Sequence, residues 1–208
     1  MKAPENRKNW NEFEWEREFR RDENRIHYYF KVLPYFLDLP GEEDIILKKM
    51  KLNPELVSQN DNWDDIAPSL FYDDYEEEQF FLNDDWAQKD NAKLYLQLVK
   101  LASQWNILFA SELKATALAA GLHITCLYGR ALAYAAEMID ADDEENITAF
   151  MLCLEKRLHR ELNRIIGKLH ELAALQPELK DQLDSYVNHL QSIREKLLDL
   201  LFQTRKTN

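Results

Sequence analysis

The stretch PELKDQLDSYVNHLQSIREKLLDLL, residues 177–201, repeats an apolar side chain alternately every four and every three positions. On an α-helix this spacing places the side chains in one narrow stripe, the heptad seam through which helices pack. Gln176-Pro177 ends one helix and begins the next, because proline is favoured at the first helical position. The stretch therefore predicts a long amphipathic helix, packed mainly inside the chain but long enough to leave a surface for a homodimer. Its seam residues are Leu179, Leu183, Tyr186, Leu190, Ile193, Leu197 and Leu200.

Helical spacing continues upstream of this stretch. Asp142 to Glu145 supply an N-cap and an acidic first turn for a helix that reaches about Leu175. Residues from Trp86 to Ala120 predict another helix, which either bends at Gly121 or continues to Ile139. An unbroken helix over residues 90–140 would measure about 75 Å, which is too long for a compact bundle. We therefore expect a bend or a break.

Two further helices are predicted nearer the N-terminus. The first covers about Asn9 to Leu37, and Pro34 should kink or end it because proline removes a backbone donor. The second, Glu42 to Lys51, has acids in its first turn and lysines at its end, which matches the helix dipole. The predicted apolar face of the first helix is Trp15, Phe19, Ile26, Tyr29, Phe30, Leu33 and Leu37.

These elements predict an all-α fold, an antiparallel helical bundle with long C-terminal helices. With 208 residues we expect a single domain, made of an N-terminal helix pair (1–58), a connection (59–90) and three long helices (91–208). The four glycines are isolated from one another, so Gly-rich phosphate-binding loops are excluded. The longest uncharged apolar run is shorter than the ~20 residues of a membrane span. We interpret Cys126 and Cys153 as buried thiols, which persist in a reducing compartment, and we therefore expect a cytoplasmic protein.

The connection carries most of the net charge. Residues 61–90 hold eleven acids and one base, a net −10 of the chain's −12. Aromatic side chains alternate with these acids, so the segment either packs against the bundle, forms a docking surface for a basic protein, or mimics the charge of a nucleic acid. The expected partner-binding residues are Trp63, Tyr72, Asp73, Asp74, Tyr75, Glu76, Glu77, Glu78 and Trp86.

A polar stripe crosses the apolar stretch 117–139. His123, Arg130 and Glu137 are seven residues apart, so they share one side of the predicted helix. One interpretation is that the helix shows this stripe to water. The other is a polar line inside the bundle, with Arg130 paired to Glu137 or to an acid elsewhere, because buried charges need partners.

Two pairs of side chains have the spacing of metal ligands. Glu23 and His27, and Glu155 and His159, are each four residues apart and so face the same way on a helix. The pattern resembles that of ferritin-like bundles, which house two metals through Glu-x-x-His. No histidine here has a glutamate three residues before it. We therefore expect no metal and no cofactor, and a metal-dependent carboxylate/histidine bundle enzyme is an alternative.

Arginine and histidine recur at a second spacing. Arg21 and His27, and Arg164 and His170, are separated by five residues. The spacing resembles the Arg-x(4–6)-His motif of HEPN ribonucleases, helical bundles whose Arg and His cut RNA at a dimer interface. The resemblance implies an RNA-cutting enzyme, whereas a net charge of −12 disfavours a grip on RNA phosphates. Our leading hypothesis is a non-enzymatic binding or regulatory protein that acts through protein–protein contacts, with nucleic acid disfavoured as a partner and no membrane.

Overall fold

A computed structural model describes residues 10–37, 39–56, 86–141 and 148–206. Within these ranges the chain forms six α-helices, four short 3-10 turns and no strand, which confirms the predicted all-α fold. The residues fall into two compact units, 13–81 and 82–208 with 1–12, and each is described by itself. The prediction of a single domain stays a prediction. None of the helices in the described ranges is both long and apolar enough to cross a membrane.

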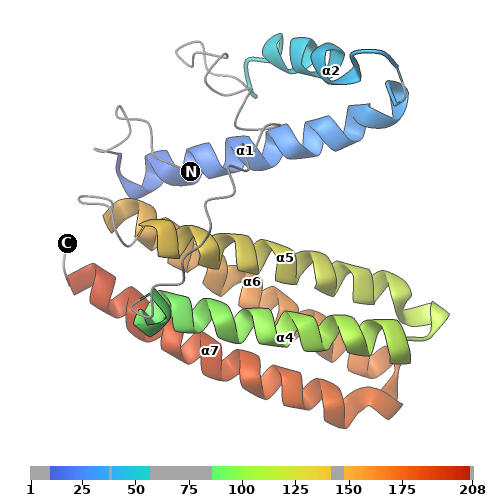
Figure 1. Ribbon diagram of the computed structural model, residues 1–208, viewed down its shortest axis with the longest axis vertical. Coiled ribbons are helices and arrows are strands. Elements are labelled where there is room, and N and C mark those ends of the chain that lie inside the picture. Colours follow the sequence, from blue (N-terminus) through green and yellow to red (C-terminus); the bar gives the residue numbers. More distant parts are fainter. Residues whose placement is uncertain (1–9, 38, 57–85, 142–147, 207–208) are drawn as a thin grey trace. The chain divides into compact units, whose positions relative to one another are not determined.

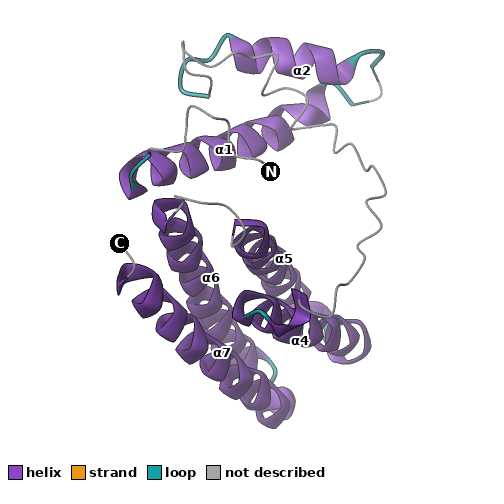
Figure 2. Ribbon diagram, turned by 60° about the vertical axis from the view of Figure 1, so that its left-hand side comes forward, coloured by secondary structure: helices purple, strands orange, loops and turns teal. Residues whose placement is uncertain are grey.

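The larger unit is a bundle of four long helices (Figure 1). They are α4 (Asp90–Glu112), α5 (Leu118–Ala141), α6 (Thr148–Leu175) and α7 (Lys180–Lys206), preceded by the short turn η3 (Trp86–Gln88). Each helix packs on the next along the chain, and α4 and α7 close the ring through fewer contacts (Figure 2). Three long helices were predicted over residues 91–208, but this count was wrong. The stretch from Trp86 to Ile139, which was counted as one helix with a bend or break, forms the two separate helices α4 and α5.

The break falls at Leu113 and Lys114, eight and seven residues before Gly121, where a bend was predicted. Leu113 and Lys114 have extended backbone conformations, and a turn at Ala115–Ala117 (η4) leads into α5. The side chain of Gln176 holds the new helix end: its Nε2 donates to the Glu112 carbonyl (2.8 Å), and its Oε1 accepts from the Lys114 amide (3.3 Å). These bonds satisfy backbone groups that a helix end leaves open.

Gly121 lies inside α5 and allows α4 to approach closely. A Cβ atom placed on Gly121 would lie 2.4 Å from Leu113 Cδ2 and 2.5 Å from the ring of Phe109. The glycine is therefore a packing residue and not a helix breaker.

Apolar side chains of all four helices meet in the centre of the larger unit. The predicted seam of α7 lies inside this core, where Leu183, Leu190 and Leu197 are buried. Trp105 of α4 is fully buried and donates to Thr125 Oγ1 (2.9 Å), while its ring stacks on Tyr128 and meets the edge of Tyr186.

The smaller unit pairs α1 (Glu12–Val32) with α2 (Glu42–Lys51). Helix α1 ends at Val32 and continues into a turn at Leu33–Tyr35 (η2), with Pro34 at the position that disfavours a regular helix. Ile46 and Met50 of α2 and Leu56 form its core.

The predicted apolar face of α1 is only partly correct. Trp15 is buried, but Ile26, Phe30 and Leu37 are exposed, and the charged residues Glu18 and Arg25 are buried instead. Arg25 is held there because its Nε donates to the Leu56 carbonyl (2.7 Å) and its Nη1 lies 3.2 Å from Glu18. A buried guanidinium needs such partners, and periodicity alone does not reveal them.

Candidate functional site

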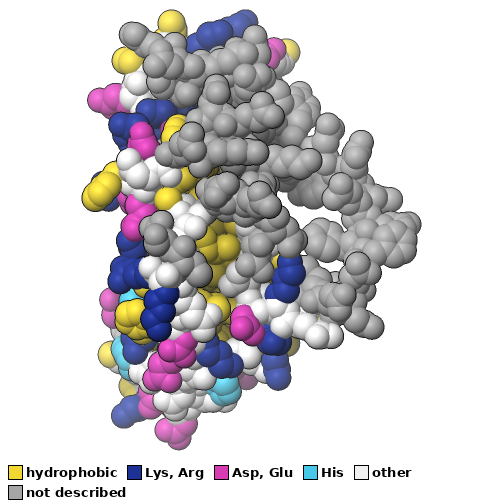
Figure 3. Space-filling model, turned by 90° about the vertical axis from the view of Figure 1, so that its left-hand side faces the viewer, with side chains coloured by type: hydrophobic (Ala, Val, Ile, Leu, Met, Phe, Trp, Pro, Cys, Tyr) yellow, Lys and Arg dark blue, Asp and Glu magenta, His cyan; other side chains and the backbone are white. Residues whose placement is uncertain are grey.

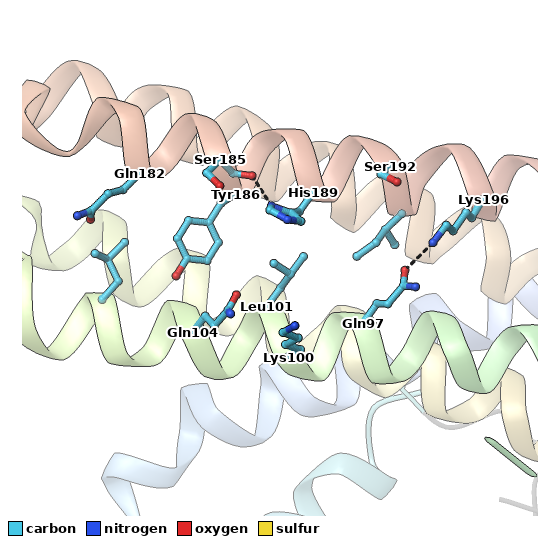
Figure 4. Close-up of a pocket in the computed structure, with 12 residues that line it drawn as sticks. Gln97, Lys100, Leu101, Gln104, Gln182, Ser185, Tyr186, His189, Ser192 and Lys196 are labelled. Carbon is cyan, nitrogen blue, oxygen red and sulfur yellow. Dashed lines mark hydrogen bonds between the residues drawn. The ribbon is translucent and has the colours of Figure 1, made fainter. Parts of the chain in front are cut away.

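A groove of about 580 Å³ runs between α4 and α7 of the larger unit (Figure 4). Its apolar side chains are Leu101, Leu108 and Ile193, all of them buried. Polar side chains from both helices make up the rest of the lining, and the close-up shows them reaching toward one another across the groove. They are Gln97, Lys100 and Gln104 from α4, and Gln182, Ser185, Tyr186, His189, Ser192 and Lys196 from α7.

The sequence creates this groove through a second heptad stripe. On α7, polar residues occur at 182, 185, 189, 192 and 196, alternately three and four residues apart, beside the buried leucine seam. The α4 wall has Gln97, Lys100 and Gln104 at the same spacing. Long polar side chains stay hydrated and do not interdigitate like leucines, so α4 and α7 share fewer contacts than the other neighbours.

Two hydrogen bonds define the polar surface of the groove. Lys196 Nζ donates to Gln97 Oε1 (3.1 Å), which links the two helices. His189 Nδ1 lies 2.7 Å from the carbonyl of Ser185, one helical turn earlier. Because a carbonyl only accepts, Nδ1 donates to it, and in the neutral ring Nε2 would then be the acceptor for a bound group.

The groove continues toward the start of α4 as a narrower channel of about 310 Å³. Gln97 and Lys196 line both parts, and Asp90 and Asp199 are found only in the channel. The wide part therefore has Lys100 and Lys196 but no acid in its lining. Elsewhere, on the face shown in Figure 3, basic and acidic side chains of the described residues are interspersed.

The predicted polar stripe of α5 does not form one site. His123 is exposed, and Arg130 and Glu137 are partly buried. Burial raises the pKa of Glu137, and the charge of Asp140 raises it further. Arg130 pairs with an acid outside the stripe, since its Nη2 lies 3.4 Å from Oε1 of Glu161 on α6.

Glu161 is the centre of a charged cluster that the sequence did not indicate. Its carboxylate is fully buried and also contacts Arg164 (3.2 Å) and Arg160 (3.5 Å) of its own helix. The three guanidinium groups compensate the cost of burying the carboxylate, and their side chains stay more than two-fifths exposed.

The four candidate metal ligands, which were expected to hold no metal, take part in different contacts. His27 is exposed, whereas His159 contacts Asn163 (3.3 Å), and burial, followed by the charge of Arg194, lowers the pKa of His159. Glu155 is buried and bonded to Thr204 Oγ1 (2.8 Å). Among the described residues, no group of three or more His, Cys, Asp or Glu side chains could hold a metal ion.

The Arg-x5-His pairs lie on uninterrupted helices. Arg21 contacts Glu18 (2.7 Å) and Arg164 contacts Glu161, while His27 and His170 are exposed. Six residues along a helix rotate the side chain by about 120° from its starting direction, so neither pair shares one face.

The acidic docking residues Trp63, Tyr72, Asp73, Asp74, Tyr75, Glu76, Glu77 and Glu78 lie outside the described residues. Trp86 begins the turn η3, but its side chain is not among those described. The docking surface stays a prediction.

Comparisons of this chain with protein-family models, with curated proteins and with solved structures found no match.

Proposed function

We propose that this chain is a non-enzymatic binding or regulatory protein, and that its α4–α7 groove receives an acidic amphipathic helix of a partner protein. The observation that carries the proposal is the lining of the wide part of the groove, which combines buried apolar side chains with lysines and neutral polar groups. Bundles with a groove between two helices recognise partner helices through such a combination.

The chemistry of the lining specifies the occupant. Leu101, Leu108 and Ile193, each less than a tenth exposed, form the floor of the groove, and the partly exposed ring of Tyr186 extends the surface that the apolar face of a helix can contact. Lys100 and Lys196 attract carboxylates, and no acid of the wide part repels them. Glutamines and serines can donate or accept hydrogen bonds along the rim, where polar contacts of an interface are found.

The groove also has a suitable length. Together with the narrow channel it follows α4 from Asp90 to Leu108, a distance of about 27 Å along the helix axis. A helix of about 18 residues covers this distance. The channel is lined by two acids, Asp90 and Asp199, and two lysines, Lys93 and Lys196, so its lining has no net charge and specifies no charge for the end of the partner helix that lies there.

A fluorescein-labelled peptide of 18 residues, with leucines on one face and glutamates on the other, tests the proposal by fluorescence anisotropy. We expect binding that weakens at least tenfold when Lys100 and Lys196 are both replaced by Glu, because each change places an acid against the peptide carboxylates. The matched control is Lys180→Glu, which changes an exposed lysine of α7 outside the groove and should bind as the wild type does.

A second peptide, with lysines in place of the glutamates, distinguishes charge recognition from apolar adhesion. It should bind poorly to the wild type and better to the Lys100→Glu, Lys196→Glu variant. Equal binding of both peptides, or equal binding by all three proteins, would exclude the groove as an acidic-helix site.

A second candidate surface rests on the net charge of −10 in residues 61–90. Acids interleaved with aromatics support docking of a basic protein there, because charge steers the encounter and aromatics supply the lasting contacts. The acidic segment would attract a basic partner, whereas the groove would attract an acidic one.

A further inference from the structure

Helix α5 carries an outward face that is apolar and uncharged. Leu118 and Leu122 are 41% and 55% exposed, and Cys126, Gly129 and Ala133 follow them on the same side of the helix and are exposed as well. Their spacing of 4, 4, 3 and 4 residues is that of a helix-packing stripe. No charged residue lies between Leu118 and Ala133 except Arg130, which turns toward Glu161. We call these five residues the α5 stripe.

The α5 stripe has bulky side chains at one end and small side chains at the other. The bulky leucines 118 and 122 lie in its first half, and Gly129 and Ala133 lie in its second half. A Cβ atom placed on Gly129 would have no neighbour within 4 Å, so the space above this glycine is open to another side chain.

This order makes the stripe complementary to itself when two copies run antiparallel. A two-fold axis beside Cys126 places Leu118 opposite Ala133 of the partner subunit and Leu122 opposite Gly129 of the partner subunit. Every bulky side chain then meets a small one, which is how closely packed helix pairs fill space. A parallel pair would instead set leucine against leucine and leave glycine against glycine.

Charge agrees with the antiparallel arrangement. Beyond the stripe, the partly buried Glu137 lies toward the end of α5, and Lys114, whose side chain pairs with Glu178 and stays 67% exposed, precedes its start. The same two-fold axis brings Glu137 of one copy toward Lys114 of the partner subunit, so opposite charges face each other at both ends. A parallel pair would bring like charges together.

We propose that the α5 stripe is the interface of an antiparallel homodimer of this chain. The burial of Leu183, Leu190 and Leu197 places the α7 seam inside one copy, and the further surface of α7 that was predicted for a homodimer stays a prediction. One helix pair makes a small interface, so the dimer should dissociate on dilution. The proposal concerns a different surface from the α4–α7 groove and does not depend on it.

Analytical ultracentrifugation of the full chain over a range of concentrations tests the association. We expect the wild type to shift from monomer to dimer as concentration rises, and Leu122→Asp to stay monomeric because it places a charge in the stripe. The matched control is Ile107→Asp, which charges a 70% exposed apolar side chain of α4 outside the stripe and should dimerise as the wild type does. Circular dichroism checks that both variants stay helical.

The antiparallel direction is tested by disulfide trapping. Leu118→Cys and Ala133→Cys are made separately, each with Cys126→Ser, mixed, and oxidised with copper phenanthroline. Trapped heterodimers, with few homodimers of either variant, are expected. Trapped homodimers alone would show a parallel pair, and a wild type that stays monomeric at all concentrations would overturn the proposal altogether.

Discussion

Glu155 shows how far a single side chain can depart from what its sequence position indicates. Its spacing to His159 indicated a helix edge, yet the structure buries it completely against Thr204 of α7. The Thr204 hydroxyl lies 2.8 Å from Glu155 Oε1 and 3.1 Å from the Leu200 carbonyl. The hydroxyl has one hydrogen and donates it to Glu155 Oε1, while Glu155 Oε2 is buried with no hydrogen-bond partner among the described residues, which disfavours a charge on this carboxyl group.

The pKa of Glu155 agrees with a neutral carboxyl group. Burial raises it from 4.5 to about 7, and the hydrogen bond from Thr204 and the charges of Arg205 and Lys156 only partly oppose this. Because the pKa is higher in the folded than in the unfolded chain, folding favours the protonated form.

We therefore predict that stability falls as pH rises from about 4.5 to about 7. In this window the unfolded chain releases the Glu155 proton while the folded chain keeps it, and the loss in the free energy of unfolding reaches at most about 3 kcal/mol. Above pH 7 this contribution is constant, and below pH 4.5 it is absent. Thermal melts from pH 4 to pH 8 measure the effect.

Glu155→Gln should remove this pH dependence and melt at a higher temperature than the wild type at pH 8, because an amide stays neutral. The control is Glu171→Gln, which changes an exposed glutamate of the same helix. If both substitutions change the melting curves equally, then folding does not raise the pKa of Glu155 and the assignment is incorrect.

The burial of charged residues could not be predicted from this sequence. A helical wheel places Glu155 and Glu161 beside the apolar stripe, and the same wheel position is open to water when no neighbouring helix covers it. The partners that allow burial, Thr204 and Arg130, come from other helices. Only the tertiary arrangement brings these side chains together.

At the scale of helices, strong periodicity was a reliable guide. The end of α6 and the start of α7 were predicted close to their observed positions, because the leucine seams and Gln176-Pro177 agreed. The predicted N-cap and acidic first turn at residues 142–145 lie outside the described residues. The break between α4 and α5 was placed at Gly121 instead of Leu113, since a glycine inside a helix looks the same in sequence whether it bends the chain or admits a neighbour.

The packing role of Gly121 predicts an unusual response to alanine. Alanine favours a helix over glycine by about 1 kcal/mol, but its Cβ would overlap Phe109 and Leu113. Gly121→Ala should therefore be less stable to urea than Gly167→Ala by about 1–3 kcal/mol. Gly167 is the matched control, because a Cβ there has no neighbour within 4 Å. Equal stability of the two variants would mean that α4 and α5 are farther apart than described.

A substitution at Leu190 tests whether the α7 seam packs within one copy of the chain or between two copies. The side chain is fully buried in the larger unit, so Leu190→Asp should unfold the bundle and not merely separate two subunits. Circular dichroism should show loss of helix, measured alongside light scattering. A variant that stays folded and loses only dimer mass would return the dimer interface to α7.

The polar residues that line the groove on α7 could be read from the sequence, but the groove itself could not be predicted. Polar residues at heptad spacing in α7 can be read directly from residues 182–196. What sequence could not give is that α4 lies opposite them, because the ring order of four helices depends on how the whole bundle closes.

At the scale of the whole molecule, charge is distributed very unevenly. Residues 61–90 hold a net −10 of −12, so the remainder of the chain is nearly neutral. Sequence establishes this asymmetry fully, whereas the structure of that segment lies outside the described residues and its docking role stays a prediction.

If the segment docks basic proteins, its binding of a labelled arginine-rich peptide should weaken steeply as salt rises, because the screening length is only ~10 Å at 0.1 M. Neutralising Asp73, Asp74, Glu76, Glu77 and Glu78 should abolish that binding without lowering the melting temperature, since like-charge repulsion is relieved. Alanine at Trp63 or Tyr75 should mainly speed dissociation.

A matched variant neutralises five acids of the bundle instead: Glu112, Glu171, Asp181, Asp184 and Glu195. It should bind the peptide nearly as the wild type does. Unchanged binding by the first variant, together with a lower melting temperature, would show that the acidic segment serves the fold and not a partner.

The side chain of Gln176 couples two chain reversals at one end of the bundle. It lies in the α6–α7 corner, yet it bonds to the Glu112 carbonyl and the Lys114 amide of the α4–α5 corner. Neither corner can fray without breaking contacts of the other, so the two should exchange backbone hydrogens with deuterium as one cooperative unit. The amide of Lys114, which would be open to solvent in an isolated turn, should be as slow to exchange as the amides at the end of α6.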